Sequence, residues 1–153
     1  MRLIILNGAK NSGKEIVAHK LAENSDCKFI RPYTDHTEVD DEYIRLNESK
    51  LSAKMERENP LYETVIDGYR WVFFENQLNA GYVVLIGDDR LISYFRKNWS
   101  GELITVRVHS NSEESSVRSN LSDDDFDIVF NVDSDDMDEL EELVGDIYLT
   151  GGE

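Results

Sequence analysis

Two glycines and a lysine stand at a spacing that suits the binding of phosphate. In the stretch LNGAKNSGKEIV, Gly8 is followed by four residues and then by Gly13 and Lys14. Glycines at this spacing let backbone N–H groups close around phosphate oxygens, and the lysine adds a positive charge. The pattern therefore predicts a site for a nucleoside phosphate. An ordinary strand-to-helix turn rich in small residues is the alternative interpretation.

The residue after the lysine departs from this pattern. Ser or Thr normally stands there and its hydroxyl holds Mg²⁺, whereas this chain has Glu15. A carboxylate could coordinate Mg²⁺ as a hard oxygen ligand, or it could repel the oxygens of a triphosphate at close range. We favour repulsion, which Lys10 would offset in part. The residues expected to contact the nucleotide's phosphates, those of ATP if the resemblance described below holds, are Gly8, Ala9, Lys10, Asn11, Ser12, Gly13, Lys14 and Glu15.

The segments around this loop predict an α/β fold. The apolar run at 2–6 is typical of a strand buried on both faces, and residues 14–24 are typical of a helix with an apolar inner side. Further apolar runs recur at 82–87, 103–109 and 126–132, separated by segments able to form helices. This alternation predicts a parallel sheet with helices on its faces.

The pattern changes between residues 38 and 70, which we interpret as a small inserted mixed α/β lobe. Short predicted strands there flank a helical stretch that Pro60 ends. With 153 residues, the chain is predicted to be a single domain (1–153). Its core would comprise residues 1–37 and 71–153, and the lobe residues 38–70.

Two more helices are predicted in the second half of the chain. Residues 71–81 are expected to form a helix that Gly81 closes. Residues 134–148 are expected to form the last helix, with Ser134 as its N-cap and acidic residues in its first turn.

The composition is strongly acidic and limits the possible partners. The chain has 32 Asp and Glu against 16 Lys and Arg, a net charge of −16. This charge disfavours nucleic acid and anionic membranes as partners, but a local nest of N–H groups can still bind a nucleotide. The start MRLIILNG holds four consecutive apolar residues, far short of the roughly 20 that span a bilayer. We therefore expect an acidic cytoplasmic protein with a nucleotide and, as a possibility, a protein as partners.

Few other side chains indicate chemistry. The single cysteine, Cys27, excludes an internal disulfide, and together with three scattered histidines it gives no metal-site spacing. No metal ligand is therefore assigned. The histidines, including His109, have no nucleophile at a recognisable spacing, which favours surface or packing roles.

Six landmarks in sequence order resemble the guanylate kinase family, and they extend along nearly the whole chain. The landmarks are the loop at 8–15, IRPYTD (30–35), DEYIRLN (41–47), LYETVIDGYRW (61–71), VVLIGDD (83–89) and FDIVFNVD (126–133). The resemblance implies a P-loop NTPase fold of guanylate kinase type, with a five-stranded parallel core sheet flanked by helices and a small inserted lobe.

The resemblance also implies transfer of a phosphoryl group from ATP to GMP or dGMP, with ATP and Mg²⁺ as cofactors. Lys14 would contact the β- and γ-phosphates of ATP. Arg31 and Tyr43 would bind the phosphate of GMP, and Glu63 would accept hydrogen bonds from guanine N1 and N2. The positions implied for the nucleoside monophosphate are Arg31, Thr34, Tyr43, Glu63, Trp71 and Asp88, the last near metal and base.

Several of these positions depart from the family pattern. The second phosphate arginine falls on Thr34, and the second tyrosine falls near Trp71, which cannot place a hydroxyl on phosphate. The loop between Glu63 and Gly68 is one residue shorter than usual. The arginine-rich lid is reduced to Arg118, the one catalytic arginine left there. Loss of such charges slows phosphoryl transfer by orders of magnitude.

Two hypotheses of different classes follow. The chain is either a nucleoside monophosphate kinase for GMP, dGMP or a related substrate, or a catalytically degenerate guanylate kinase-like domain that binds a protein or senses a nucleotide. A third hypothesis, an acidic mimic of nucleic acid that occupies a DNA-binding partner, rests on charge alone. Dependence of nucleotide binding on Mg²⁺ would separate the first two.

Overall fold

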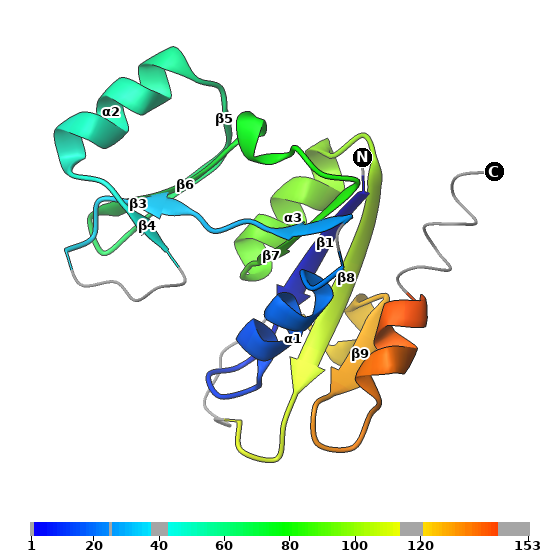
Figure 1. Cartoon of the computed structure of the whole chain (residues 1–153). Helices are drawn as coiled ribbons and strands as arrows, with labels where there is room; N and C mark the ends of the chain where they lie inside the picture. Colours follow the sequence, from blue (N-terminus) through cyan, green and yellow to red (C-terminus); the bar gives the residue numbers. More distant parts are fainter. Residues whose placement is uncertain (1, 25, 38–42, 114–120, 144–153) are drawn as a thin grey trace. The chain divides into compact units, whose positions relative to one another are not determined.

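The chain divides into two units, each with its own sheet (Figure 1). One unit comprises Met1–Phe29 and Ala80–Glu153, and the other comprises Ile30–Asn79, a wider segment than the lobe at 38–70 that the sequence predicts. The computed structural model describes residues 2–24, 26–37, 43–113 and 121–143.

The first unit is built on a five-stranded sheet in the order β2-β7-β1-β8-β9. All four strand pairs are parallel, as the sequence predicts. Its elements are β1 (Arg2–Asn7), α1 (Lys14–Leu21), β2 (Cys27–Phe29), β7 (Tyr82–Ile86), α3 (Asp89–Asn98), β8 (Glu102–His109), the 3-10 turn η2 (Asp123–Asp125) and β9 (Ile128–Asn131).

The central strand β1 is buried on both faces because helices cover both sides of the sheet. Ile4 and Leu6 pack in one cluster with residues of α1. Leu3 and Ile5 point to the opposite face, where Arg96 of α3 donates to Thr105 Oγ1 at 3.4 Å. Figure 1 shows α1 and α3 on opposite sides of the sheet. The continuous apolar run of β1 is thus explained by burial from both directions.

The order of the strands creates a ligand position at the carboxyl edge of β1 and β8. The chain leaves β1 toward β2 on one side of the sheet, and it leaves β8 toward β9 on the other. In open α/β sheets, the crevice where the connections diverge in this way is the usual place for a ligand. The glycine loop that follows β1 lies at this edge.

The second unit is a four-stranded mixed sheet with one helix. The strand order is β4-β3-β6-β5, and a small core of Leu51, Val72 and Phe74 joins α2 to the sheet. Its elements are β3 (Tyr33–Thr34), β4 (Ile44–Arg45), α2 (Glu48–Arg57), β5 (Pro60–Ile66), β6 (Tyr69–Phe74) and the 3-10 turn η1 (Glu75–Gln77). The predicted mixed α/β character of this part is confirmed.

The predicted helix at 71–81 is wrong. Most of this segment's first half belongs to β6, which pairs antiparallel with β5 and is followed by the short turn η1. Asp67 and Gly68 both have positive φ angles, 54° and 83°. That conformation is the one a two-residue hairpin turn requires, and it directs the aromatic residues after it back along β5.

The last helix begins later than predicted. Its described part covers 137–143, and Asp136 rather than Ser134 caps it, because Asp136 Oδ1 accepts a hydrogen bond from the N–H of Asp138 at 3.0 Å. Ser134 instead lies in the turn after β9, where its N–H donates to the carbonyl of Asn131. No helix within the described ranges is long and apolar enough to cross a membrane.

We expect Phe74→Ala to destabilise the second unit by about 3–5 kcal/mol, because the ring is fully buried and leaves a cavity in a small core. Hydrogen exchange of amides in β5 and β6 would measure the loss. Ile66→Ala, at a position that is 42% exposed in the same hairpin, is the control and should change little. Unchanged protection in Phe74→Ala would contradict the role given to this core.

Candidate functional site

The loop between β1 and α1 has a backbone that leaves N–H groups open to an anion. Asn11 and Gly13 adopt left-handed conformations, with φ of 64° and 90°, and Asn and Gly are the residues that tolerate this region best. Gly13 is the N-cap residue of α1 and supplies no side-chain cap. The first N–H groups of α1 therefore remain available to an anion at the positive end of the helix.

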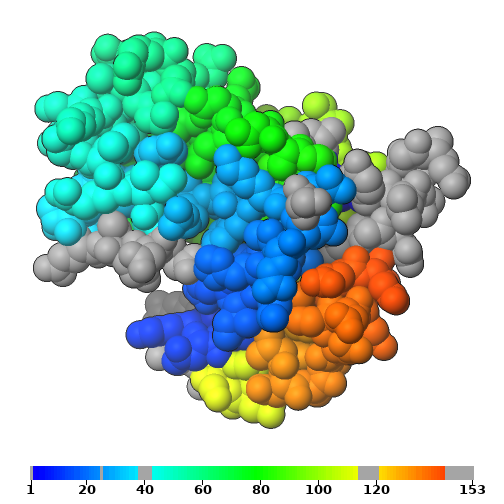
Figure 2. Space-filling view, in the orientation of Figure 1, coloured from blue at the N-terminus to red at the C-terminus, as the bar shows by residue number. Residues whose placement is uncertain are grey.

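Lys14 arches back over the loop. Its Nζ donates to the carbonyl of Ala9 at 3.2 Å, and the N–H of Ser12 donates to the same carbonyl at 3.1 Å. The loop is thereby closed on itself with the lysine above it. In Figure 2 the loop, in blue, lies at the surface of its unit beside the yellow segment that follows β8, and Ser110 Oγ donates to the carbonyl of Asn11 at 2.5 Å.

Ser12 is an unusual polar residue in this loop. Its side chain is fully buried, and its Oγ has no hydrogen-bond partner among the described residues. A buried hydroxyl without a partner costs about 1–3 kcal/mol. Such an atom is expected where a loop is shaped to close around a bound anion or an ordered water.

Glu15 lies against the lysine. The distance from Lys14 Nζ to Glu15 Oε1 is 3.6 Å, and the two side chains are 18% and 42% exposed. A carboxylate in the first turn of α1 is also favoured by the helix dipole. Glu15 thus neutralises part of the charge that the loop would offer to a phosphate.

Asp88 caps a helix at the end of the neighbouring strand. Its carboxylate accepts a hydrogen bond from the N–H of Leu91 at 3.0 Å, as N-cap of α3. Asn7 Nδ2 donates to the carbonyl of Gly87 at 2.8 Å and joins the ends of β1 and β7. Asp88 therefore lies at the predicted edge, but one of its oxygens serves the helix.

His109, at the end of β8, lies between two carboxylates. Its Nδ1 is 2.8 Å from Glu113 Oε1, and its Nε2 is 2.9 Å from Asp123 Oδ1. Both ring nitrogens can donate only in the protonated imidazolium. Burial lowers the pKa of His109, but the hydrogen bonds that its ring donates to Asp123 and Glu113, together with the negative charges of these carboxylates, raise it by more, so the pKa lies above its ordinary value. Arg107 Nη1, 3.7 Å from Asp123 Oδ1, adds a second cation.

Three residues predicted for the acceptor nucleotide lie together in the second unit. Thr34 is opposite Trp71 in the pairing of β3 with β6, and the rings of Tyr43 and Trp71 meet edge to face at 4.8 Å. Thr34 is fully buried, and Trp71 Nε1 is buried without a hydrogen-bond partner among the described residues. These three side chains share one face of the lobe sheet.

Glu63 lies on the other face. It is opposite Val72, whereas Thr64 is opposite Trp71. Side chains alternate between faces along a strand, so Glu63 and Trp71 lie on opposite faces of this sheet.

Of the two predicted arginines, Arg31 lies just before β3 in the second unit. The backbone carbonyl of Arg31 accepts a hydrogen bond from Gln77 Nε2 at 2.9 Å. Arg118 lies outside the described residues.

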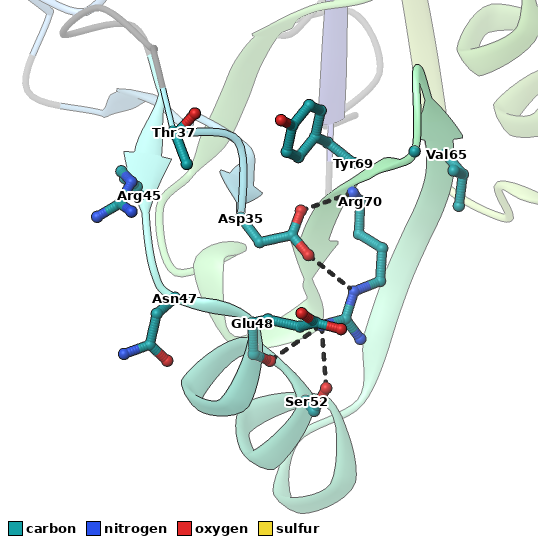
Figure 3. A pocket seen from close by; sticks show the side chains of 10 residues that line it. Asp35, Thr37, Arg45, Asn47, Glu48, Ser52, Val65, Tyr69 and Arg70 are labelled. Carbon is teal, nitrogen blue, oxygen red and sulfur yellow. Dashed lines mark hydrogen bonds and ion pairs between the residues drawn. The ribbon is translucent and has the colours of Figure 1, made fainter.

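Sequence reasoning missed two groups of polar residues. The first is the cluster at His109. The second is in the lobe, where Arg70 binds Asp35 through its backbone N–H at 2.8 Å and its Nε at 3.4 Å (Figure 3). The partner of Arg70 is 35 residues away in the sequence, and those of His109 are four and 14 residues away, at spacings that match no recognised motif. A local signal was the charged Arg70 within an otherwise apolar strand.

Comparison with known proteins supports the fold and leaves the site open. No family model and no curated protein sequence matches the chain. Among solved structures 55 chains match, and one is guanylate kinase from Anaplasma phagocytophilum. It has a TM-score of 0.62 and 13% identity over 97% of this chain and 84% of that chain. The chain thus has a guanylate kinase-like α/β fold, as the sequence predicts.

We expect the His109 cluster to stabilise the fold most at low pH. Because the folded-state pKa is raised, the stabilisation is fully present below the unfolded-state value of about 6.5 and is lost as pH rises through the folded-state value. The free energies of unfolding of the wild type and His109→Gln should therefore differ most below about pH 6.5. They should converge as the pH rises above the folded-state pKa of His109. His19→Gln, at an exposed site on α1, is the control, and a difference independent of pH would contradict the assignment.

We expect Asp88→Ala to lower the free energy of unfolding by about 1 kcal/mol, because the N-cap of α3 is lost. Asp88→Asn should change it little, since Asn caps helices as well as Asp does. Urea unfolding of both variants measures this. Equal destabilisation by Asn and Ala would show that the charge of Asp88, rather than its cap, is what the fold requires.

Proposed function

We propose that this chain is a guanylate kinase-like nucleotide-binding protein that holds the phosphates of ATP at residues 8–15. The observation that carries the proposal is the arrangement of Gly13 and Lys14. Gly13 leaves the N-terminus of α1 uncapped, and Lys14 Nζ is held above the loop by the carbonyl of Ala9. Backbone donors and one lysine around a closed loop are the chemistry that recognises a phosphate.

If the protein is catalytic, it transfers a phosphoryl group from ATP to GMP, dGMP or a related nucleoside monophosphate. Lys14 would then stabilise the charge that develops on the transferred group. The guanylate kinase-like fold supports this assignment. Thr34, Tyr43 and Trp71, which share a face of the lobe sheet, would line the path of the acceptor.

Mg²⁺, which such a reaction needs, fits the described residues poorly. Glu15 replaces the hydroxyl at the metal position, and its carboxylate lies beside Lys14. Asp88 is engaged as a helix cap. The described residues contain no group of three or more His, Cys, Asp or Glu able to hold a metal ion. The residues present suit a phosphate better than a triphosphate bound to Mg²⁺.

This mismatch favours a second candidate, a catalytically degenerate domain that senses a nucleotide or binds a protein. The ion pair of Lys14 with Glu15 is the specific observation behind it. A sensor needs the phosphate loop but no metal ligand, so its nucleotide binding should not depend on Mg²⁺. A kinase should bind ATP more tightly when Mg²⁺ is present.

We expect Lys14→Ala to weaken ATP binding about tenfold or more, because a charged hydrogen bond to phosphate is lost. Calorimetric titration with ATP, with and without Mg²⁺, measures the change and separates the two candidates. Lys20→Ala, an exposed lysine on α1, is the matched control. Equal ATP affinity in Lys14→Ala and the wild type would overturn the proposed function.

A further inference from the structure

The chain just after β8 contacts the loop between β1 and α1 on both sides of His109. The carbonyl oxygen of Val108 approaches the loop so closely that a Cβ at Gly8 would lie 2.6 Å from it. Ser110 Oγ donates to the carbonyl of Asn11 at 2.5 Å. His109 therefore lies between two residues that touch the loop, and a change at its ring is one residue away from either contact.

The turn that begins at His109 is tied to the segment after β9. The N–H of Val132 donates to the carbonyl of His109 at 2.9 Å, and the N–H of Asn111 donates to Asp133 Oδ2 at 2.6 Å. These bonds fix the start and the middle of the turn. Its far end, Glu113, is held to β8 by the ring of His109, at 2.8 Å from Glu113 Oε1 to Nδ1.

The proton on His109 decides how many carboxylates the ring can hold. An imidazolium donates from both nitrogens, to Glu113 and to Asp123, whereas a neutral imidazole donates from one. Asp123 has a second cationic neighbour, because Arg107 Nη1 lies 3.7 Å from its Oδ1. Asp123 thus keeps a partner in either state. Loss of the proton therefore releases Glu113, at the end of the turn that carries Ser110.

The same proton changes the charge beside the loop. Among the described residues, Glu113 of the turn and Asp123 of η2 face the ring, Arg107 of β8 pairs with Asp123, and Asp133 adds a carboxylate from the segment after β9. His109 and Arg107 balance Glu113 and Asp123 only while the ring is protonated, and a neutral ring adds one net negative charge to this edge. The loop itself contributes Lys10, Lys14 and Glu15, of which the last two form an ion pair.

We propose that protonation of His109 strengthens the binding of an anion at residues 8–15. The protonated ring holds Glu113 and with it the turn that seats Ser110 against Asn11, and it removes one net negative charge from the edge where the anion binds. Loss of the proton reverses both effects. The inference rests on the proposed function and adds to it a regulation of the same site by pH.

The direction and size of the effect follow from linkage. Hydrogen bonds and charge from Asp123 and Glu113 hold the pKa of His109 above its ordinary value of about 6.5, so anion affinity is highest near pH 6 and declines as the pH rises through the folded-state pKa. Because coupling between sites is reciprocal, a bound anion raises the pKa of His109 in turn. A coupling of about fivefold, the low end for linked sites, corresponds to a rise in pKa of about 0.7.

The first test is calorimetric titration of ATP into the full chain and into His109→Gln, from about pH 6 to about pH 9. Protonation of ATP itself affects both proteins alike, so the ratio of their affinities reports on His109. The wild type should bind about fivefold more tightly at the low end, and this advantage should disappear at the high end. His19→Gln, at an exposed position of α1, is the matched control and should follow the wild type.

A second variant separates titration from a purely structural role. Glu113→Gln keeps an oxygen that can accept from the ring but loses the charge, so it should lower the pKa of His109 and move the midpoint of the pH dependence to lower pH. Glu56→Gln, exposed on α2, should leave the midpoint unchanged. In the wild type, NMR titration of the His109 ring should show a pKa higher by about 0.7 at saturating sulfate, an anion that does not titrate in this range.

The inference is overturned if the affinity ratio of wild type to His109→Gln is the same at every pH, or if sulfate leaves the pKa of His109 unchanged. If ATP binding still depends on Lys14 in that case, the proposed function stands without the regulation. Absence of ATP binding to the wild type at every pH would overturn the proposed function and the inference together.

Discussion

The loop between β1 and α1 keeps its shape because position 8 has no side chain. A Cβ at Gly8 would lie 2.4 Å from Ser12 Oγ and 2.6 Å from the carbonyl oxygen of Val108, and contacts that short force the backbone to move. The loop therefore rests directly on the end of β8, and the bond from Ser110 to Asn11 closes the same contact from the other side. The geometry of the phosphate loop thus depends on one close approach of two backbone segments.

The same contact makes the end of β8 part of the site. His109 immediately precedes the residue that bonds the loop, and its two carboxylate partners come from the segments before and after residues 114–120. A protonated His109 joins Glu113 to Asp123 beside a loop that would hold an anion. In a protein with a net charge of −16, a cation between two carboxylates at this edge reduces the negative potential that a phosphate would meet.

The sheet and the loop could be predicted from the sequence because their signals are local. The apolar run of β1, the spacing of Gly8 and Gly13, and the helix that follows are adjacent in the chain and agree with one another. The lobe could be predicted only in outline. The turn at Asp67 and Gly68 carried a hairpin signal, but the aromatic residues after it also suited a helix, and pairing with β5 decided between the two.

Site residues of the lobe were harder to predict because their positions depend on strand register. Glu63 has the residue type that would read guanine, yet its register opposite Val72 places it on the face away from Trp71. The pairing of Arg70 with Asp35 spans 35 residues, and no local pattern reports it. A match of residue types along a chain does not fix which side chains share a face, since a change of one residue in a strand connection reverses that relation.

Under the proposed function, the departure at position 15 would alter how strongly the loop binds phosphate, while the loop keeps the left-handed residues Asn11 and Gly13. The Lys14–Glu15 pair is partly exposed, and such pairs are worth only about 0–1 kcal/mol, so a phosphate could displace Glu15 from the lysine at small cost. The larger effect is repulsion between the Glu15 carboxylate and the phosphate oxygens of a ligand. At 4 Å such repulsion amounts to about 1–4 kcal/mol per pair of unit charges, depending on solvent exposure. This repulsion grows with the negative charge of the ligand. It would act where a triphosphate carries most of its negative charge. If residues 8–15 hold a phosphate as proposed, position 15 would discriminate by charge, and it would disfavour a metal-free triphosphate more than a ligand with fewer negative charges.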